Sequence, residues 1–209
     1  MLLFALATAA FGAFLKLTSE LTEGELEPFD HAVLSRVIQL RTPGLNGIAV
    51  DITALGSVTV VSLITSVAVI CFAIGRHWSS VAQLIFASIG GGFLSTVLKH
   101  VLERERPAEL GRLVQVASFS YPSGHSLAAA SVYVTLAITV ARLVDSRSPR
   151  VAAFVFAFGL SLTVGFSRAY LGVHYPSDIA AGLLLGTGWA FSVGACFSYL
   201  RGRGRVPSD

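Results

Sequence analysis

The chain has 209 residues, of which 54% are hydrophobic and only 13% are charged. Its mean hydropathy of +0.72 is well above that of an ordinary water-soluble domain, so the composition excludes a soluble enzyme and indicates an integral membrane protein. The net charge of +3 does not come from a dense run of Lys and Arg, so we expect no nucleic-acid partner.

Apolar runs along the chain predict the membrane-spanning helices. A crossing needs roughly 20 mostly apolar residues. The first run has no basic segment before it, so we expect a retained helix rather than a cleaved signal peptide. The prediction is an all-α integral membrane bundle of six spans, forming a single domain over residues 1–209. The six runs are Leu2–Leu17, Ile52–Gly75, Val81–Leu98, Ser126–Ala141, Val151–Ser167 and Ile179–Leu200.

Between the first two spans the sequence predicts a further helix. Apolar residues recur there at helical spacing with polar residues opposite them, which favours a helix lying in the membrane interface. A helix that covers the bundle would show the same pattern, and both alternatives stay open. The apolar residues are Phe29, Val33, Leu34, Val37 and Ile38, and the polar ones are Asp30, Ser35, Arg36 and Gln39.

The two cysteines, Cys71 and Cys196, both fall inside apolar spans. Cysteine is among the residues most often buried in proteins, and neither position has further Cys or His beside it in a metal-binding spacing. We therefore expect two small buried hydrophobic side chains rather than a disulfide or a metal site.

The loop charges predict how the bundle is oriented, because Lys and Arg concentrate on the cytoplasmic side of membrane helices. An N-terminus inside the cell places the polar segments Lys99–Pro122 and Arg168–Asp178 outside. These segments also carry cations, which a functional need for positive charge outside would explain. The arginines assigned to the cytoplasm are Arg76, Arg142, Arg147, Arg150, Arg201, Arg203 and Arg205.

The first polar cluster is KHVLERERP, Lys99 to Pro107. Lys99 and Arg106 are seven residues apart, which predicts that both cations project from one face of a helix that Pro107 ends. His100 would point about 100° away from Lys99, so we leave it outside the site. Snorkelling of basic side chains at the end of a span explains the same residues, and the roles of the neighbouring glutamates stay open.

The second cluster is YPSGH, Tyr121 to His125. Pro122 suits the first position of a helix, and Ser123 and Gly124 place backbone N–H groups at its start. Free N–H groups at a helix N-terminus bind anions, and His125 adds a side chain that donates a proton near neutral pH. A capped helix with a hydrogen-bonded histidine is the alternative.

The third cluster is SRAYLGVHYPSD, Ser167 to Asp178. The guanidinium of Arg168 suits phosphate oxygens. Because Pro176 disfavours α conformation at the residue before it, we expect His174 in a water-facing loop and Asp178 in the first turn of the next helix. The carboxylate then fixes one imidazole nitrogen and leaves the other as a nucleophile, although an isolated His–Asp pair is more often structural.

Together the three clusters place cations, histidines and one carboxylate at one end of the bundle. Phosphoryl transfer needs charge stabilisation, a nucleophile and a proton donor for the leaving oxygen. A metal centre is the competing interpretation, but the sequence has no second carboxylate beside His174 and no Cys cluster. We therefore expect a phosphate site without a metal.

The three clusters resemble the three-part signature of the type-2 phosphatidic acid phosphatase superfamily, within residues 99–178. All parts are present in the family's order, and the resemblance extends over roughly Ser80 to Leu200. It implies the bacterial integral-membrane branch, similar to phosphatidylglycerophosphate and undecaprenyl pyrophosphate phosphatases, because the hydropathy argues against the soluble acid phosphatases and haloperoxidases of the superfamily. The matching residues are Lys99, Arg106, Pro107, Pro122, Ser123, Gly124, His125, Ser167, Arg168, His174 and Asp178.

The resemblance also implies a role for each residue. His174 attacks phosphorus and forms a phosphohistidine, Asp178 orients it, and His125 protonates the departing lipid oxygen. The phosphoryl oxygens are held by Lys99, Arg106, Ser123, Gly124 and Arg168. The family reaction uses no cofactor or metal, and its site faces the periplasm or exterior of a multi-pass protein of the cell membrane.

Two other functions stay open. A lipid phosphotransferase would pass the phosphoryl group from the same histidine to another lipid, and a lipid-binding or transport protein would keep the scaffold without turnover. In each case the partners are a membrane lipid and the bilayer. The sequence leaves the identity of the lipid and the oligomeric state open.

Overall fold

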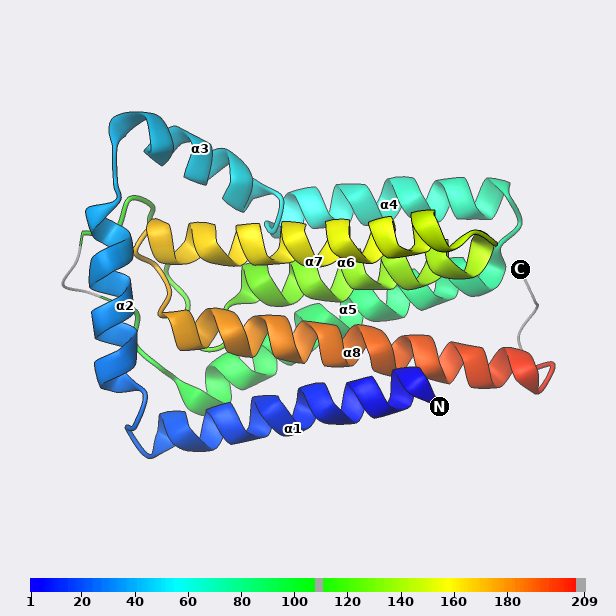
Figure 1. Cartoon of the computed structure of the whole chain (residues 1–209), viewed down its shortest axis with the longest axis horizontal. Coiled ribbons are helices and arrows are strands. Elements are labelled where there is room, and N and C mark those ends of the chain that lie inside the picture. Colours follow the sequence, from blue (N-terminus) through cyan, green and yellow to red (C-terminus); the bar gives the residue numbers. More distant parts are fainter. Residues whose placement is uncertain (108–110, 206–209) are drawn as a thin grey trace.

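The computed structural model describes residues 1–107 and 111–205, and these residues form eight helices and no strands (Figure 1). The predicted polar segment Lys99–Pro122 and the predicted domain 1–209 therefore each include a few positions, 108–110 and 206–209, outside the described residues. The helices are α1 Leu2–Thr22, α2 Glu27–Gln39, α3 Pro43–Ala54, α4 Val58–Ile74, α5 Trp78–Leu102, α6 Gly124–Leu143, α7 Arg147–Tyr170 and α8 Pro176–Gly202.

Five of these helices, α1, α5, α6, α7 and α8, are long and apolar enough to cross a membrane. The pair α3 and α4, which meet at an angle of 47°, adds a sixth candidate crossing if it is counted as one bent span. The all-α fold is thus confirmed, but the predicted unbroken helix over Ile52–Gly75 is wrong. The chain breaks between Ala54 and Val58, where the Ser57 side chain accepts a hydrogen bond from the Val60 N–H and starts a new helix.

Gly56 explains why the break occurs at this place. A Cβ atom there would lie 2.5 Å from a Val164 methyl group and 3.0 Å from the His125 carbonyl oxygen. Only glycine allows the α3–α4 junction to approach α6 and α7 so closely. The break therefore brings the end of α3 against the polar end of the bundle.

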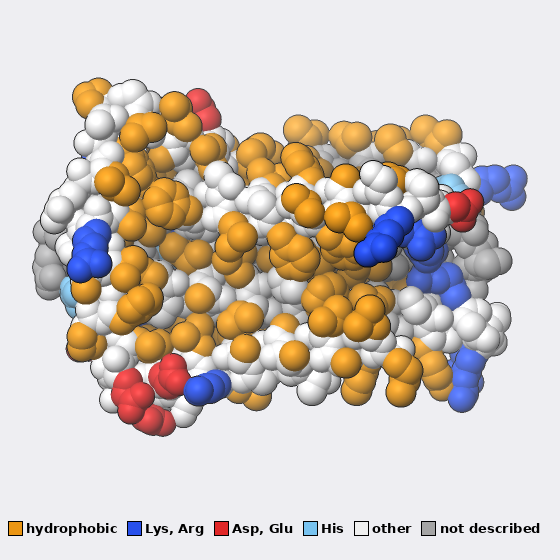
Figure 2. All heavy atoms as spheres, in the orientation of Figure 1, with side chains coloured by type: hydrophobic (Ala, Val, Ile, Leu, Met, Phe, Trp, Pro, Cys, Tyr) orange, Lys and Arg blue, Asp and Glu red, His pale blue; other side chains and the backbone are white. Residues whose placement is uncertain are grey.

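Helix α6 is the centre of the bundle, with α8 packed along it. Close packing of α8 on α6 depends on two glycines of α8. A Cβ atom on Gly182 would lie 2.5 Å from the Ser123 carbonyl oxygen, and a Cβ atom on Gly186 would lie 2.5 Å from the Leu127 carbonyl oxygen. Hydrophobic side chains cover the length of the bundle, with charges at its ends (Figure 2). Cys71 and Cys196 are exposed, so their predicted burial is wrong: both face outward from the bundle rather than into its core.

Helix α2 crosses one end of the bundle, where it packs against α7 and α8 (Figure 1). Leu34 and Val37 are buried in this contact, as expected for the apolar face. Asp30, which the sequence pattern places on the polar face, is fully buried. The helix therefore does cover the bundle, and one of its carboxylates points inward.

The two ends of the bundle differ in what they carry. The N-terminus, the turns around Arg76 and Asp145, and the end of α8 lie together at one end, where Arg side chains gather (Figure 2). Helix α2 and the two predicted polar segments lie at the other end. The chain path thus separates the seven assigned arginines from the predicted site.

Candidate active site

A cavity of about 1120 Å³ lies at the end of the bundle that carries α2. Six of the eight predicted site residues line it, from five separate segments of the chain. Ser123 and Asp178 do not line it and lie behind residues that do. The lining residues from the prediction are Lys99, Arg106, Gly124, His125, Arg168 and His174.

His174 lies in the turn between α7 and α8, and Asp178 lies in the first turn of α8, as the sequence predicts. The Nδ1 atom of His174 is 3.3 Å from Oδ2 of Asp178, and its Nε2 atom is 3.0 Å from Nη1 of Arg106. A guanidinium only donates hydrogen bonds, so Nε2 accepts and the ring proton is on Nδ1, facing the carboxylate. The lone pair of Nε2 therefore points toward Arg106 and accepts its hydrogen bond.

The expected water-facing position of His174 is wrong, because its side chain is only 1% exposed. Burial is the main cause that lowers its pKa to about 3, and it outweighs the opposite effect of Asp178. His174 is thus a neutral imidazole at physiological pH. A neutral ring is the form that can act as a nucleophile.

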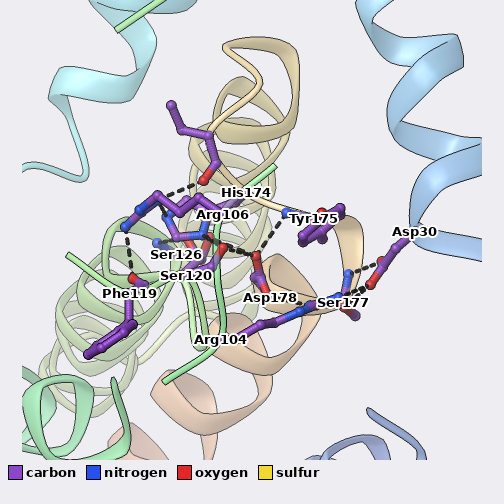
Figure 3. Close-up of polar contacts among 12 residues, drawn as sticks. Asp30, Arg104, Arg106, Phe119, Ser120, Ser126, His174, Tyr175, Ser177 and Asp178 are labelled. Atoms are coloured by element: carbon purple, nitrogen blue, oxygen red, sulfur yellow. Dashed lines mark hydrogen bonds and ion pairs between the residues drawn. The ribbon is translucent and has the colours of Figure 1, made fainter. Parts of the chain in front are cut away.

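The carboxylate of Asp178 is fully buried and hydrogen-bonded on both oxygens. Oδ2 accepts from the Ser120 hydroxyl at 2.5 Å and from the Tyr175 N–H at 2.8 Å. Oδ1 accepts from Nη1 of Arg104 at 2.6 Å. These bonds compensate for the lost hydration of the charge and fix the orientation of the carboxylate (Figure 3).

Arg106 lies beyond α5, so the predicted helix face shared with Lys99 is wrong. The helix ends at Leu102 because Glu103 takes a left-handed conformation with φ 42°, and an irregular segment carries Arg106 back to the cavity. Its Nε donates to the Ser118 carbonyl at 2.6 Å, and its Nη1 to the Val173 carbonyl at 2.6 Å. Burial is the main cause that lowers the Arg106 pKa to about 10, which still leaves a cation at neutral pH.

The other two predicted cations reach the same cavity. Lys99 donates to the carbonyl of Phe119, which also accepts from Arg106. Nη1 of Arg168 donates to the Thr53 hydroxyl at 2.9 Å, at the end of α3. The buried Nε of Arg168 has no acceptor within the described part of the chain, so it keeps one donor for a ligand.

The start of α6 differs in detail from the prediction. Pro122 precedes the helix, Ser123 is the N-cap, and the helix begins at Gly124. The Ser123 hydroxyl is fully buried and accepts from Ser126, so it stabilises the first turn and does not line the cavity. Gly124 lines the cavity, where a Cβ built on it would lie 3.7 Å from Cε of Lys99, and His125 follows it.

Four polar residues at the site were missing from the prediction: Asp30, Arg104, Ser120 and Ser177. Arg104 forms ion pairs with both Asp30 and Asp178, rather than with a neighbouring glutamate. His100 lines the cavity, contrary to expectation. Arg104 and Ser177 lie within the first and third polar clusters, which was the available signal for them, whereas nothing in the sequence pointed to Asp30.

Comparison with known proteins places these features in context. The profile of the PAP2 superfamily matches residues 80–202. Phosphatidylglycerophosphatase B of Bacillus subtilis (strain 168) is 32% identical over 175 residues, which cover 83% of this chain and 85% of that protein. The undecaprenyl-diphosphatase of Sulfolobus acidocaldarius is 33% identical over 105 residues, or 47% of this chain and 46% of that protein.

A solved structure has the same architecture over almost the whole chain. It is the crystal structure of a transmembrane PAP2 type phosphatidylglycerolphosphate phosphatase from Bacillus subtilis. The two structures agree with a TM-score of 0.85 at 28% sequence identity, over 93% of this chain and 96% of the other. The helix arrangement around the cavity is thus that of a solved membrane enzyme.

Proposed function

Because this chain belongs to the PAP2 superfamily, we propose that it is a membrane lipid phosphatase that hydrolyses a phosphate monoester or a diphosphate through a phosphohistidine on His174. The observation that carries the proposal is the convergence of three cations and two histidines on one cavity. These five side chains come from α5, the segment after it, α6, α7 and the turn before α8. Such a set supplies the charge, the nucleophile and the proton donor that the reaction needs.

The first step is attack of His174 Nε2 on phosphorus. A bond forms between Nε2 and phosphorus while the bond from phosphorus to the leaving oxygen breaks, and that oxygen takes the electron pair. His125, which holds a proton when the anionic phosphate is bound beside it, gives that proton to the leaving oxygen. Asp178 accepts from Nδ1–H and stabilises the positive charge that the imidazole gains.

The second step is hydrolysis of the intermediate. His125, now neutral, takes a proton from a water molecule, whose oxygen attacks phosphorus. The bond between Nε2 and phosphorus breaks, and the imidazole recovers its lone pair. Inorganic phosphate leaves, and both histidines return to their starting forms.

The three cations would hold the phosphoryl oxygens during both steps. Arg168 lines the cavity and has a buried Nε without an acceptor in the described residues. Lys99 and Arg106 donate to carbonyls of the segment before α6, so a bound phosphate would replace some of these bonds. Gly124 N–H, at the start of α6, adds a helix N-terminus to the same group.

The proposed substrate class is a lipid with a terminal phosphate, either phosphatidylglycerophosphate, undecaprenyl pyrophosphate or phosphatidic acid. The cavity also has uncharged walls from Val58, Gly91, Gly92 and Ala128, which belong to the membrane-crossing helices. An acyl or isoprenoid chain would lie along this wall while its phosphate reaches the cations. The named activities of the relatives favour the first two lipids.

We place the protein in the cell membrane, with the cavity facing the periplasm or exterior. The support is the gathering of arginines at the opposite end of the bundle, which the distribution of charge in membrane proteins assigns to the cytoplasm. The same proposal includes a reaction without a cofactor. It also gives Ser123 an indirect role, because as the N-cap of α6 it fixes the position of the Gly124 N–H.

The test is phosphate release by the purified protein in detergent, with a chelator present, from each of the three lipids. We expect release that is lost in His174→Ala and kept in His77→Ala, a matched histidine at the other end of the bundle. Loss of release on chelation would overturn the metal-free reaction. Transfer to an added lipid alcohol without phosphate release would identify a phosphotransferase, and binding without turnover would identify a lipid-binding protein.

A further inference from the structure

Asp30 is a fully buried carboxylate on α2, outside the region that the superfamily profile matches. Its Oδ1 accepts from the Ser177 N–H at 2.9 Å, and its Oδ2 accepts from the Ser177 hydroxyl at 2.5 Å. Oδ2 also pairs with Nη2 of Arg104 at 2.7 Å. Burying a charge is costly, and these contacts with Ser177 and Arg104 compensate for that cost.

Arg104 connects Asp30 to the proposed catalytic pair. Its Nη1 lies 2.6 Å from Oδ1 of Asp178, so one guanidinium bridges two buried carboxylates (Figure 3). The Arg104 guanidinium also lies over the Tyr175 ring, with its Cζ atom 4.3 Å from the ring centroid. Burial by itself lowers the pKa of Arg104, but the two carboxylates outweigh it and the pKa is raised. The guanidinium is therefore a permanent cation.

The charges form a continuous series, Asp30, Arg104, Asp178 and His174. If Arg104 had Asp178 as its one anionic partner, its positive charge would offset the carboxylate that faces the imidazole. Asp30 supplies a second negative charge, which leaves the charge of Asp178 available to His174. The negative charge of Asp178 is needed most when His174 attacks phosphorus, because the imidazole becomes a cation when it is phosphorylated.

We propose that Asp30 is a positioning residue for phosphoryl transfer, which acts through Arg104 to keep Asp178 both oriented and charged toward His174. The inference rests on the proposed phosphohistidine reaction. It assigns to α2, the helix that crosses the end of the bundle, a part in the chemistry beyond covering the site. The competing role is a structural one, in which Asp30 merely attaches α2 to α8 through Ser177.

The experiment follows phosphoenzyme formation by rapid quench with a ³²P-labelled lipid substrate in detergent. The burst amplitude reports the fraction of active protein, and the burst rate reports the attack of His174. We expect Asp30→Asn to lower the burst rate by at least about tenfold, with the amplitude and KM changed less than about twofold. Glu27→Gln, which removes an exposed carboxylate one turn away on α2, is the matched control and keeps the wild-type rate.

Two further variants separate the electrostatic role from the structural one. Removing both charges in Asp30→Asn with Arg104→Gln restores the balance of charge, so we expect its burst rate to exceed that of Asp30→Asn. A purely structural attachment would be weakened further by the second change. Asp30→Glu keeps the charge and is expected to recover most of the rate, which also decides the question if Asp30→Asn does not fold.

The outcomes for the two proposals are distinct. A wild-type burst that depends on His174, together with an Asp30→Asn burst rate equal to that of Glu27→Gln, overturns the role of Asp30 and leaves the reaction intact. A reduced amplitude at an unchanged burst rate also overturns it, since that result means loss of folded protein. Absence of any phosphoenzyme in the wild type overturns the phosphohistidine reaction and this inference with it.

Discussion

Nε2 of His174 accepts a hydrogen bond from Nη1 of Arg106 at 3.0 Å, so the proposed nucleophile and one proposed phosphate ligand are in direct contact. The contact fixes the ring proton on Nδ1, which donates a hydrogen bond to Asp178. It also means that the arginine must release Nε2 when a phosphoryl group binds. Arg106 thus acts on the histidine as well as on the substrate.

Replacing Arg106 with lysine keeps the charge but removes this geometry. Lysine has no planar fork and cannot bond Nε2 and the carbonyls of Ser118, Phe119 and Val173 together. We expect kcat/KM to fall by about 10²-fold, with a larger share of the other His174 tautomer in ¹⁵N NMR spectra. An unchanged tautomer ratio would contradict the role of Arg106 toward His174.

The buried neutral state of His174 predicts how stability depends on pH. Its pKa is about 3 in the folded protein, below the ordinary value of 6.5, so the unfolded chain binds the additional proton. The free energy of unfolding is therefore not reduced by this histidine above pH 6.5, and it decreases as the pH falls from 6.5 toward 3. We expect acidification from pH 7.5 to 5 to lower the thermal midpoint of the wild type more than that of His174→Asn. Equal decreases would show that another group controls the acid response.

The proposed role of His125 as proton donor can be tested by changing the leaving group of the substrate. With a lipid alcohol as leaving group, His125→Asn is expected to lower kcat by about 10²- to 10⁴-fold, because the alkoxide then departs without a proton. With a p-nitrophenyl phosphate ester the leaving phenolate is stable, so the loss should be at least tenfold smaller. A loss of the same size for both substrates would assign His125 to phosphate binding instead.

The packing of α8 on α6 positions the start of α6, and Gly182 tests this contact. A Cβ in Gly182→Ala would lie 2.5 Å from the Ser123 carbonyl oxygen, so α8 must move away from the turn that carries Gly124 and His125. We expect a destabilisation of about 1–3 kcal/mol, measured by unfolding in detergent, and reduced turnover. Gly159→Ala on α7, where nothing lies within 4 Å, is the control and should not destabilise the protein.

The orientation in the membrane can be read from cysteine labelling. After Cys71 and Cys196 are replaced by serine, Glu25→Cys marks the end of the bundle that carries the cavity, and Ser148→Cys marks the opposite end. We expect a membrane-impermeant maleimide added to intact cells or spheroplasts to label position 25 and not position 148. The reverse result would place the cavity in the cytoplasm.

The length, composition and apolar runs of the chain suffice to predict much of this protein. Six crossings follow from hydropathy because the bilayer demands helices of nearly fixed length, and the five unbroken ones occur in the structure within a few residues of the prediction. The position of Asp178 in the first turn of α8 followed from the local rule for proline. Long apolar runs and the conformational preferences of residues next to proline can both be read from a single sequence.

The helix break at Gly56 and the path of Arg106 escaped this reasoning. Residues 52–75 form one apolar run long enough to cross the membrane, and the break reflects the close approach of Val164 and His125 from distant parts of the chain. Arg106 reaches the cavity because Glu103 turns the chain, although the seven-residue spacing fits a helix equally well. In both places a contact between segments outweighed the local pattern.

The sequence by itself determined the class of protein, the apolar runs long enough to cross a membrane and six of the residues that line the cavity, because membrane thickness and motif chemistry act over short stretches of chain. Only the tertiary structure decided that His174 is buried and neutral, that Ser123 caps a helix, and that Asp30 pairs with Arg104 across 74 positions of sequence. Burial and ion pairing depend on which distant segments meet, and that information lies in the packed bundle.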